Sequence, residues 1–225
     1  MIHYTISYNK PHRHFVDFEL TTKTNGRDRM QFQLPAWRPG RYELANFSQN
    51  IQKWGAYNEN GNAIDFRKIT KDLWEVDTKD CLEITITYNY YANQLDAGAS
   101  YLDEKQVYLN PVNCMFYIVD RIEDNYEVVL EIPDNYKIAS SLDRNDNSLF
   151  AKNYDILSES PIICSDNLQH DTYEVSGIKF HIWFQGDCTP DWKKIKTDFS
   201  AFTKSQTTHF GGFPVDEYHF LFQIT

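Results

Sequence analysis

The chain has 225 residues, with 32 acidic and 22 basic side chains and a formal net charge of −10. Hydrophobic residues make up 41% of it and aromatic residues 16%. This excludes a disordered chain, because disordered chains lack the apolar surface that offsets the entropy of ordering. No run of the sequence approaches the ~18 apolar residues of a membrane-spanning helix, so no membrane partner is expected. The acidic balance also argues against nucleic acid as a partner, because phosphate backbones bind clustered basic residues.

The cysteines and the N-terminus bear on the compartment. Cys81, Cys114, Cys164 and Cys188 are widely spaced and form no C-x-x-C pair, so the ligand spacing of structural zinc sites is missing. The first residues begin directly on a strand pattern, without the basic and apolar segments of a secretory signal. We therefore expect a cytoplasmic protein with reduced cysteines.

Most of the chain is predicted to form strands. Apolar and polar residues alternate in residues 14–20, 82–90, 126–132 and 178–184, a period of two that places the apolar set on one face of a sheet. In the second segment, Leu82 shares the predicted inward face with Ile84. Strands joined by polar turns without helices between them predict antiparallel sheets packed as a β-sandwich. The sequence thus predicts a mainly β protein, with an N-terminal β domain over residues 1–168.

The pattern changes near residue 189. Thr189 is a residue type that caps helices, and Pro190 suits the first helical position. A stripe of apolar residues at helical spacing then predicts a helix to about Thr207. This stripe consists of Trp192, Ile195, Phe199 and Phe202. Gly211 lies just beyond the predicted helix, and residues 218–224 are predicted to form a buried strand.

One helix and one strand cannot bury a core by themselves. We therefore expect residues 169–225 to be the short α/β start of a second, truncated domain. The alternative is that the last strand completes the first sandwich.

Catalytic signatures are missing from the sequence. It contains no H-E-x-x-H, no G-x-S-x-G and no phosphate-binding loop. His12 and His14 are placed on one face of a predicted strand, where they could hold a metal ion if a third ligand converged on them. A polar strand edge beside a turn explains the same pattern. No catalytic residue, metal ligand or cofactor is therefore assigned to this chain.

Two segments combine fixed backbone with polar side chains. The first is Leu34-Pro35-Ala36-Trp37-Arg38-Pro39-Gly40-Arg41-Tyr42, in which prolines and a glycine fix a strand exit and a turn. The second runs from residue 101 to residue 114 and interleaves amides and phenols with apolar residues beside Pro111. It could present hydrogen-bonding groups at the edge of a cleft, or its side chains could satisfy irregular backbone.

The first of these segments resembles the signature of the N-terminal domain of the glycyl aminopeptidase family, zinc metallopeptidases with a thermolysin-like catalytic domain. Weaker similarities occur in the family's order over almost the whole chain, in residues 4–8, 11–20, 46–51, 71–76, 88–102, 150–157, 160–161 and 213–222. In the family, the last of these leads to a glycine-rich segment and a helix with H-E-x-x-H, neither of which lies within residues 1–225.

The resemblance implies that this chain is the N-terminal fragment of a zinc aminopeptidase that favours N-terminal Gly or Ala. Its partners would be the missing catalytic domain and a peptide substrate with a small N-terminal residue. Zinc is expected in the full-length protein and no cofactor in this chain, which we expect to be inactive alone and to flank the substrate cleft.

The resemblance also suggests substrate-binding residues. Related two-domain zinc aminopeptidases take part of their contact to the substrate's α-amine from the N-terminal β domain. The best candidates here are Tyr108, Asn110 and Asn113, with Asp103 nearby, because they combine acceptor oxygens with a proline-fixed backbone.

A binding module is the alternative function. A stand-alone aromatic β-sandwich could bind carbohydrate or peptide through exposed rings. The available tryptophans are Trp37, Trp54, Trp74, Trp183 and Trp192.

Overall fold

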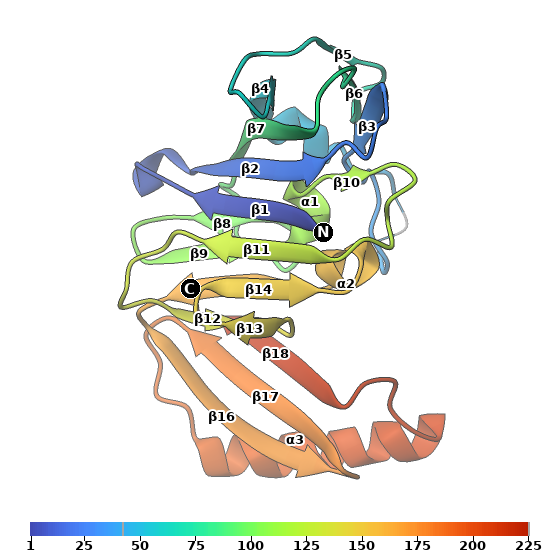
Figure 1. Ribbon diagram of the computed structural model, residues 1–225. Helices are drawn as coiled ribbons and strands as arrows, with labels where there is room; N and C mark the ends of the chain where they lie inside the picture. Colours follow the sequence, from blue (N-terminus) through green and yellow to red (C-terminus); the bar gives the residue numbers. More distant parts are fainter. Residues whose placement is uncertain (42, 225) are drawn as a thin grey trace. The chain divides into compact units, whose positions relative to one another are not determined.

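The computed structural model describes residues 1–41 and 43–224 and is mainly β (Figure 1). This confirms the predicted fold class. The chain divides into two compact units, one of residues 1–134 and 142–162, the other of residues 135–141 together with those from Ile163 onward. Tyr42, the last residue of the signature segment, lies outside the described residues.

The first unit is built around a seven-stranded sheet of order β13-β14-β11-β1-β2-β7-β4 (Figure 1). Neighbouring strands pair antiparallel, except β1 and β11, which pair parallel. The strands are β1 (Ile2–Ser7), β2 (Phe15–Lys23), β4 (Ile51–Asn58), β7 (Glu83–Tyr91), β11 (Tyr126–Leu130), β13 (Asp143–Asn145) and β14 (Ser148–Ala151).

A second, four-stranded sheet has the order β10-β3-β6-β5. Its strands are β3 (Arg29–Gln33), β5 (Phe66–Lys68), β6 (Leu73–Asp77) and β10 (Tyr117–Ile118). β2 and β3 belong to different sheets and are joined through Asn25 and Gly26, both at positive φ (54° and 72°), the backbone of a tight β-turn. The remaining elements of the first unit are η1 (Pro11–Arg13), η2 (Phe47–Asn50), β8 (Tyr101–Leu102), β9 (Gln106–Leu109), α1 (Pro111–Cys114) and α2 (Tyr154–Ser158).

The core of the first unit is aromatic. Val16, Phe18 and Leu20 are buried on one face of β2, as their spacing predicts. Phe116 contacts Tyr88 of the large sheet edge-to-face at 4.9 Å, and Trp74 of the smaller sheet at 5.1 Å between ring centroids. Aromatic pairs of this geometry add stability beyond the area that they bury.

Three buried tyrosines hold the backbone that follows α1, and we call Tyr4, Tyr88 and Tyr154 the tyrosine clamp. The Tyr88 hydroxyl donates to the Cys114 carbonyl at 2.7 Å. The Tyr154 hydroxyl donates to the Met115 carbonyl at 2.7 Å. The Tyr4 hydroxyl donates to the Phe116 carbonyl at 2.9 Å and accepts from the Phe116 amide at 2.8 Å. Side chains of β1, β7 and α2 therefore fix the segment just after α1.

The second unit contains a three-stranded sheet of order β16-β17-β18. β16 (Leu168–Val175) pairs antiparallel with β17 (Ile178–Gln185), and β17 pairs parallel with β18 (Glu217–Gln223). Phe180 and Ile182 form its apolar core, against which Ile195 and Phe199 of α3 (Trp192–Phe210) pack. β12 (Lys137–Ala139) pairs antiparallel with β15 (Ile162–Ser165).

The start of α3 differs from the prediction. Its N-cap is Asp191, whose carboxylate accepts from the Lys194 amide at 3.0 Å, and not Thr189. Pro190 therefore precedes the cap instead of opening the helix. Gly211 ends the helix at φ 77°, a left-handed conformation that favours glycine.

Three further local predictions were wrong. Leu82 is 77% exposed, because it precedes the first residue of β7 and lies outside the alternation of that strand. The final strand is half-buried instead of buried, with Tyr218 42% exposed. His12 lies in a 3-10 helix and His14 follows it at φ 58°, so the two do not share a strand face.

Within the described part of the chain, we find no helix whose length and apolar character would suffice to span a membrane.

Candidate functional site

The structure brings together three of the four predicted substrate-binding residues. Tyr108 lies on β9, Asn110 is the N-cap of α1, and Asn113 lies within that helix. Asn110 has extended backbone (φ −106°, ψ 102°) because the following residue is Pro111, and a residue before proline avoids the helical region. We call Tyr108, Asn110 and Asn113 the asparagine cluster.

The asparagine cluster holds the loop of residues 96–100 through the loop's carbonyls. The Tyr108 hydroxyl donates to the Ala97 carbonyl at 3.1 Å, and the Asn113 amide nitrogen donates to the Gly98 carbonyl at 2.8 Å. The Asn110 side-chain nitrogen Nδ2 also donates to the Ala97 carbonyl, at a longer 3.4 Å. The Asn110 backbone amide donates to the Ser100 hydroxyl at 3.1 Å.

Both asparagines keep an acceptor oxygen free. Asn113 Oδ1 is buried and has no hydrogen-bond partner among the described residues. Asn110 Oδ1 makes no cap hydrogen bond to its helix, and the side chain bonds the loop through Nδ2 instead. Buried polar atoms are nearly always satisfied, so the unpaired Asn113 oxygen is a position where a water molecule, an ion or a ligand group would complete the hydrogen bonding. Two amide oxygens beside a fixed loop can accept hydrogen bonds from an ammonium group.

The Tyr108 hydroxyl remains a donor at neutral pH. Burial, together with the nearby Asp96 carboxylate, raises the pKa of Tyr108 to about 12, while the Arg38 charge acts in the opposite direction. The phenol therefore stays protonated and keeps its bond to the loop.

Arg38 was not identified from the sequence as a site residue. Its guanidinium lies against Gly98, where a Cβ atom would come within 2.0 Å of Arg38 Nη2. Arg38 Nε is buried and has no partner in the described part of the chain. This contact brings Arg38 to the loop that the asparagine cluster holds. The sequence shows that Arg38 lies in a rigid turn, but not which loop it meets.

Asp103 lies at the other end of the β8–β9 hairpin from Asn110. Its Oδ1 accepts from the amides of Lys105 at 2.8 Å and Gln106 at 2.9 Å. This is a turn-forming arrangement, and the structure does not join Asp103 to the asparagine cluster.

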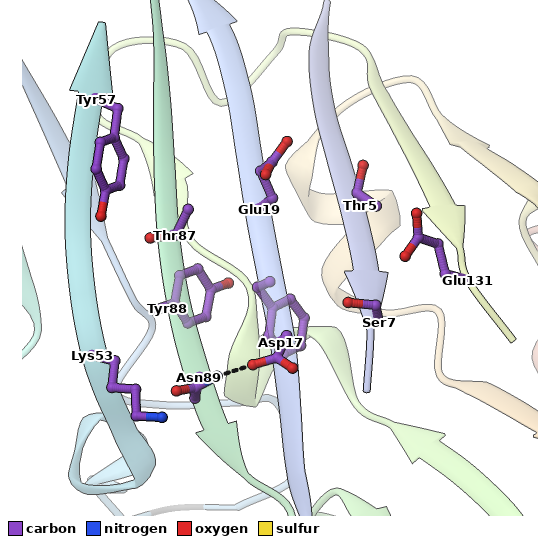
Figure 2. Close-up of a pocket in the computed structure, with 11 residues that line it drawn as sticks. Thr5, Ser7, Asp17, Glu19, Lys53, Tyr57, Thr87, Tyr88, Asn89 and Glu131 are labelled. Carbon is purple, nitrogen blue, oxygen red and sulfur yellow. Dashed lines mark hydrogen bonds between the residues drawn. The ribbon is translucent and has the colours of Figure 1, made fainter. Parts of the chain in front are cut away.

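A polar groove runs over the outward face of the seven-stranded sheet. Figure 2 shows Lys53, Asp17 and Asn89 near one end of it, with the Asn89 amide donating to the Asp17 carboxylate. Burial raises the pKa of Asp17, and the Lys53 charge partly offsets this. The groove is lined by the polar residues that alternate with the core, among them Thr5, Glu19, Tyr57 and Thr87. It can bind polar groups, but it contains no recognisable catalytic arrangement.

Histidines from adjacent strands meet on the three-stranded sheet. His170, His181 and His219, with Glu217, form what we call the histidine cluster. His170 Nε2 lies 3.0 Å from His181 Nδ1, and His181 Nε2 lies 3.5 Å from Glu217 Oε2. The rings of His181 and His219 stack at 4.2 Å between centroids. The sequence predicted His181 on the polar face of its strand but gave no indication of these partners.

Burial, and then the repulsion between nearby cationic groups, favours the neutral form of the three imidazoles. Burial lowers the pKa of His170 and of His181. The pKa of His219 falls to about 4, mainly through burial and then through the charges of His181, His170 and Lys179.

Comparison with protein families identifies the chain. The model described as the peptidase M61 N-terminal domain matches residues 3–166. The chain belongs to this family. The match confirms the peptidase resemblance seen in the sequence, at the level of the family. No curated protein matches the M61 chain.

Solved structures resemble the M61 chain over nearly its full length. The aminopeptidase N family protein from Idiomarina loihiensis is 26% identical with a TM-score of 0.92, covering 100% of this chain and 39% of that protein. The M1 zinc metallopeptidase from Deinococcus radiodurans is 11% identical with a TM-score of 0.52, covering 98% of this chain and 55% of that one, and shows a shared fold. The M61 chain thus spans about two fifths to half of the length of these proteins.

Stability of the M61 chain's second unit should fall as the pH drops from about 6.5 to 4. The folded pKa of His219 is depressed, so the unfolded state binds more protons in this range and stability rises with pH. His170, His181, Lys179 and Glu217 face the same ring. Allowing for its partial exposure, the loss is about 1–3 kcal/mol.

The protection of β17 amides against hydrogen exchange, compared in metal-free protein at pH 7 and pH 5, measures this loss. His219→Phe removes the titrating group, so the protection of the β17 amides in this variant should depend less on pH. Equal pH dependence in the two proteins would contradict the assignment.

Proposed function

We propose that this chain is the N-terminal region of a zinc aminopeptidase that prefers N-terminal Gly or Ala, and that it forms one edge of the substrate cleft. The observation that carries the proposal is the match of the M61 N-terminal domain model to residues 3–166. The unpaired acceptor of Asn113 in the asparagine cluster supports a role at the cleft. A longer protein containing this chain would supply the peptidase chemistry.

The residues present do not fit the helical zinc motif of such enzymes, because residues 1–225 contain no H-E-x-x-H. Zinc bound by the longer protein would polarise the scissile carbonyl and activate a water molecule. This chain would contribute substrate positioning.

The asparagine cluster would hold the substrate's α-ammonium group. Asn110 Oδ1 is a free acceptor, and the Asn113 and Tyr108 bonds keep the 96–100 loop in place beside it. A preorganised acceptor binds a cation at a smaller entropic cost than a mobile one. A peptide with a small N-terminal residue is the proposed partner, and the cytoplasm the proposed location.

An aminoacyl-anilide panel tests the proposal. The longer protein should hydrolyse glycyl and alanyl anilides faster than leucyl or phenylalanyl anilides, and a zinc chelator should abolish this activity. The 225-residue chain alone should show no turnover. A longer protein that hydrolyses none of these substrates would contradict the proposal. Specific binding on a glycan array would then favour the binding module.

A further inference from the structure

The sheet of the second unit has two chemically different faces. Phe180 and Ile182 of β17 pack on one face against α3 residues. His181 alternates with them and lies on the other face, between His170 of β16 and His219 of β18. Adjacent strands therefore gather imidazoles on the face away from α3.

The spacing of three of these side chains suits a metal ion. His181 and His219 are directly opposite in the parallel register. His181, Glu217 and His219 each offer a ligand atom, and these atoms lie within 4.8 Å of one another. A tetrahedral site with bonds of 2.0–2.2 Å needs ligand atoms about 3.4 Å apart. The 3.5 Å between His181 Nε2 and Glu217 Oε2 already meets this requirement.

His181 has an unused nitrogen in the right place. His181 is 8% exposed, and among the described residues its Nε2 has no hydrogen bond of good geometry, only the long 3.5 Å ion-pair contact with Glu217 Oε2. When Nδ1–H is donated to His170 Nε2, 3.0 Å away, the lone pair of Nε2 faces Glu217. A metal-binding histidine commonly has such a partner on its other nitrogen, which fixes its tautomer.

Trp183 opposes metal binding by His219. Its indole N–H donates to His219 Nδ1 at a long 3.3 Å. A metal at Nδ1 would displace this donor. A metal at Nε2 would require a proton on Nδ1, facing the indole N–H. Whichever nitrogen is the ligand, binding must break this weak hydrogen bond.

We propose that His181, Glu217 and His219 bind one divalent transition-metal ion, with His170 as the hydrogen-bond partner of His181 and solvent as a further ligand. Two imidazoles and a carboxylate are a donor set that suits Zn²⁺ and Co²⁺. Glu217 is exposed and His219 half-buried, so the ion can reach the site from solvent. This inference goes beyond the proposed function and does not depend on it.

Cobalt titration of the 225-residue chain tests the site. We expect binding with one-to-one stoichiometry, the visible d–d bands of low-coordinate Co²⁺, and displacement by Zn²⁺. His219→Ala should weaken binding by about a hundredfold or more, since even the loss of a hydrogen-bond partner of a metal ligand typically costs 10- to 100-fold. His170→Ala should weaken it by about tenfold or more for that reason.

Three further variants test a second ligand, the competing indole donor and a histidine outside the site. Glu217→Gln changes an exposed side chain and keeps the fold, and it should also weaken binding. Trp183→Phe removes the competing donor but retains a ring beside His170, so it should tighten binding several-fold. His3→Ala is the matched control. His3 Nδ1 pairs with Glu127 Oε2 at 2.9 Å on the first unit, outside the described metal-capable group, and its loss should leave binding unchanged.

Two outcomes would overturn the inference. One is the absence of saturable Co²⁺ or Zn²⁺ binding by the folded chain. The other is binding of equal strength in the parent chain, Glu217→Gln and His219→Ala, which would locate the ion elsewhere.

Discussion

Tyr4→Phe should destabilise the first unit by about 2–4 kcal/mol, because it leaves two buried backbone groups of Phe116 without a partner. The Tyr4 hydroxyl accepts from the Phe116 amide at 2.8 Å and donates to its carbonyl at 2.9 Å. Phe116 is completely buried, so water cannot replace these bonds. Burial raises the pKa of Tyr4 well above its usual value, so the hydroxyl stays protonated.

Tyr154→Phe is the matched control, because its hydroxyl makes a single bond, to the Met115 carbonyl at 2.7 Å. We expect it to cost about 1–2 kcal/mol. Urea unfolding of both variants measures the difference. Equal losses would show that Tyr4 does not satisfy the Phe116 amide.

Asn110→Ala in the longer protein should raise KM for a glycyl substrate by about ten- to a hundredfold, because a hydrogen bond to a charged group contributes about 1.5–3 kcal/mol. This prediction rests on the proposed function. The variant should be nearly as stable as the parent, because the Asn110 side chain makes just a 3.4 Å bond to Ala97 and no cap bond within the described structure.

Asn153→Ala is the control for a helix-capping asparagine. Asn153 caps α2, with its side chain accepting from the Ile156 amide at 3.0 Å. Its loss should lower stability by about 1 kcal/mol without changing KM. If Asn110→Ala instead lowers stability and leaves KM within about twofold, no substrate contact was lost and the asparagine is structural.

Local alternation predicted the strands well, because burial of one sheet face dictates a period of two. The buried positions Val16, Phe18 and Leu20 follow it. The first and last residues of the strands and helices were less predictable. Leu82 continues the alternation by one residue beyond the strand, and Thr189 precedes the helix by too many residues to cap it.

The contacts that build the sites depend on register and on long-range packing, which a single sequence does not reveal. The Tyr4 bonds to Phe116 span 112 positions. His181 and His219 become neighbours only through the parallel pairing of β17 with β18. The two-residue spacing of His12 and His14 predicted that they share one face of a strand. In the structure His12 lies in a 3-10 helix and His14 has left-handed backbone, so they share no strand face.

The asparagine cluster was found by a different signal. The family resemblance, together with acceptor oxygens beside the backbone that Pro111 fixes, grouped Tyr108, Asn110 and Asn113, but it also included Asp103, which belongs to a separate turn. Their common partner, the 96–100 loop, and the contact of Arg38 with Gly98 were visible in the structure alone.

The most direct test of the cleft-edge role is the coupling between Asn110 and the substrate's α-amine in the longer protein. Asn110→Ala and the parent are each assayed with glycyl anilide and with acetyl anilide, which lacks the amine. We expect the substitution to lower kcat/KM for the glycyl substrate by about ten- to a hundredfold and to change it less than about twofold for the acetyl substrate. Equal losses on both substrates would contradict this role.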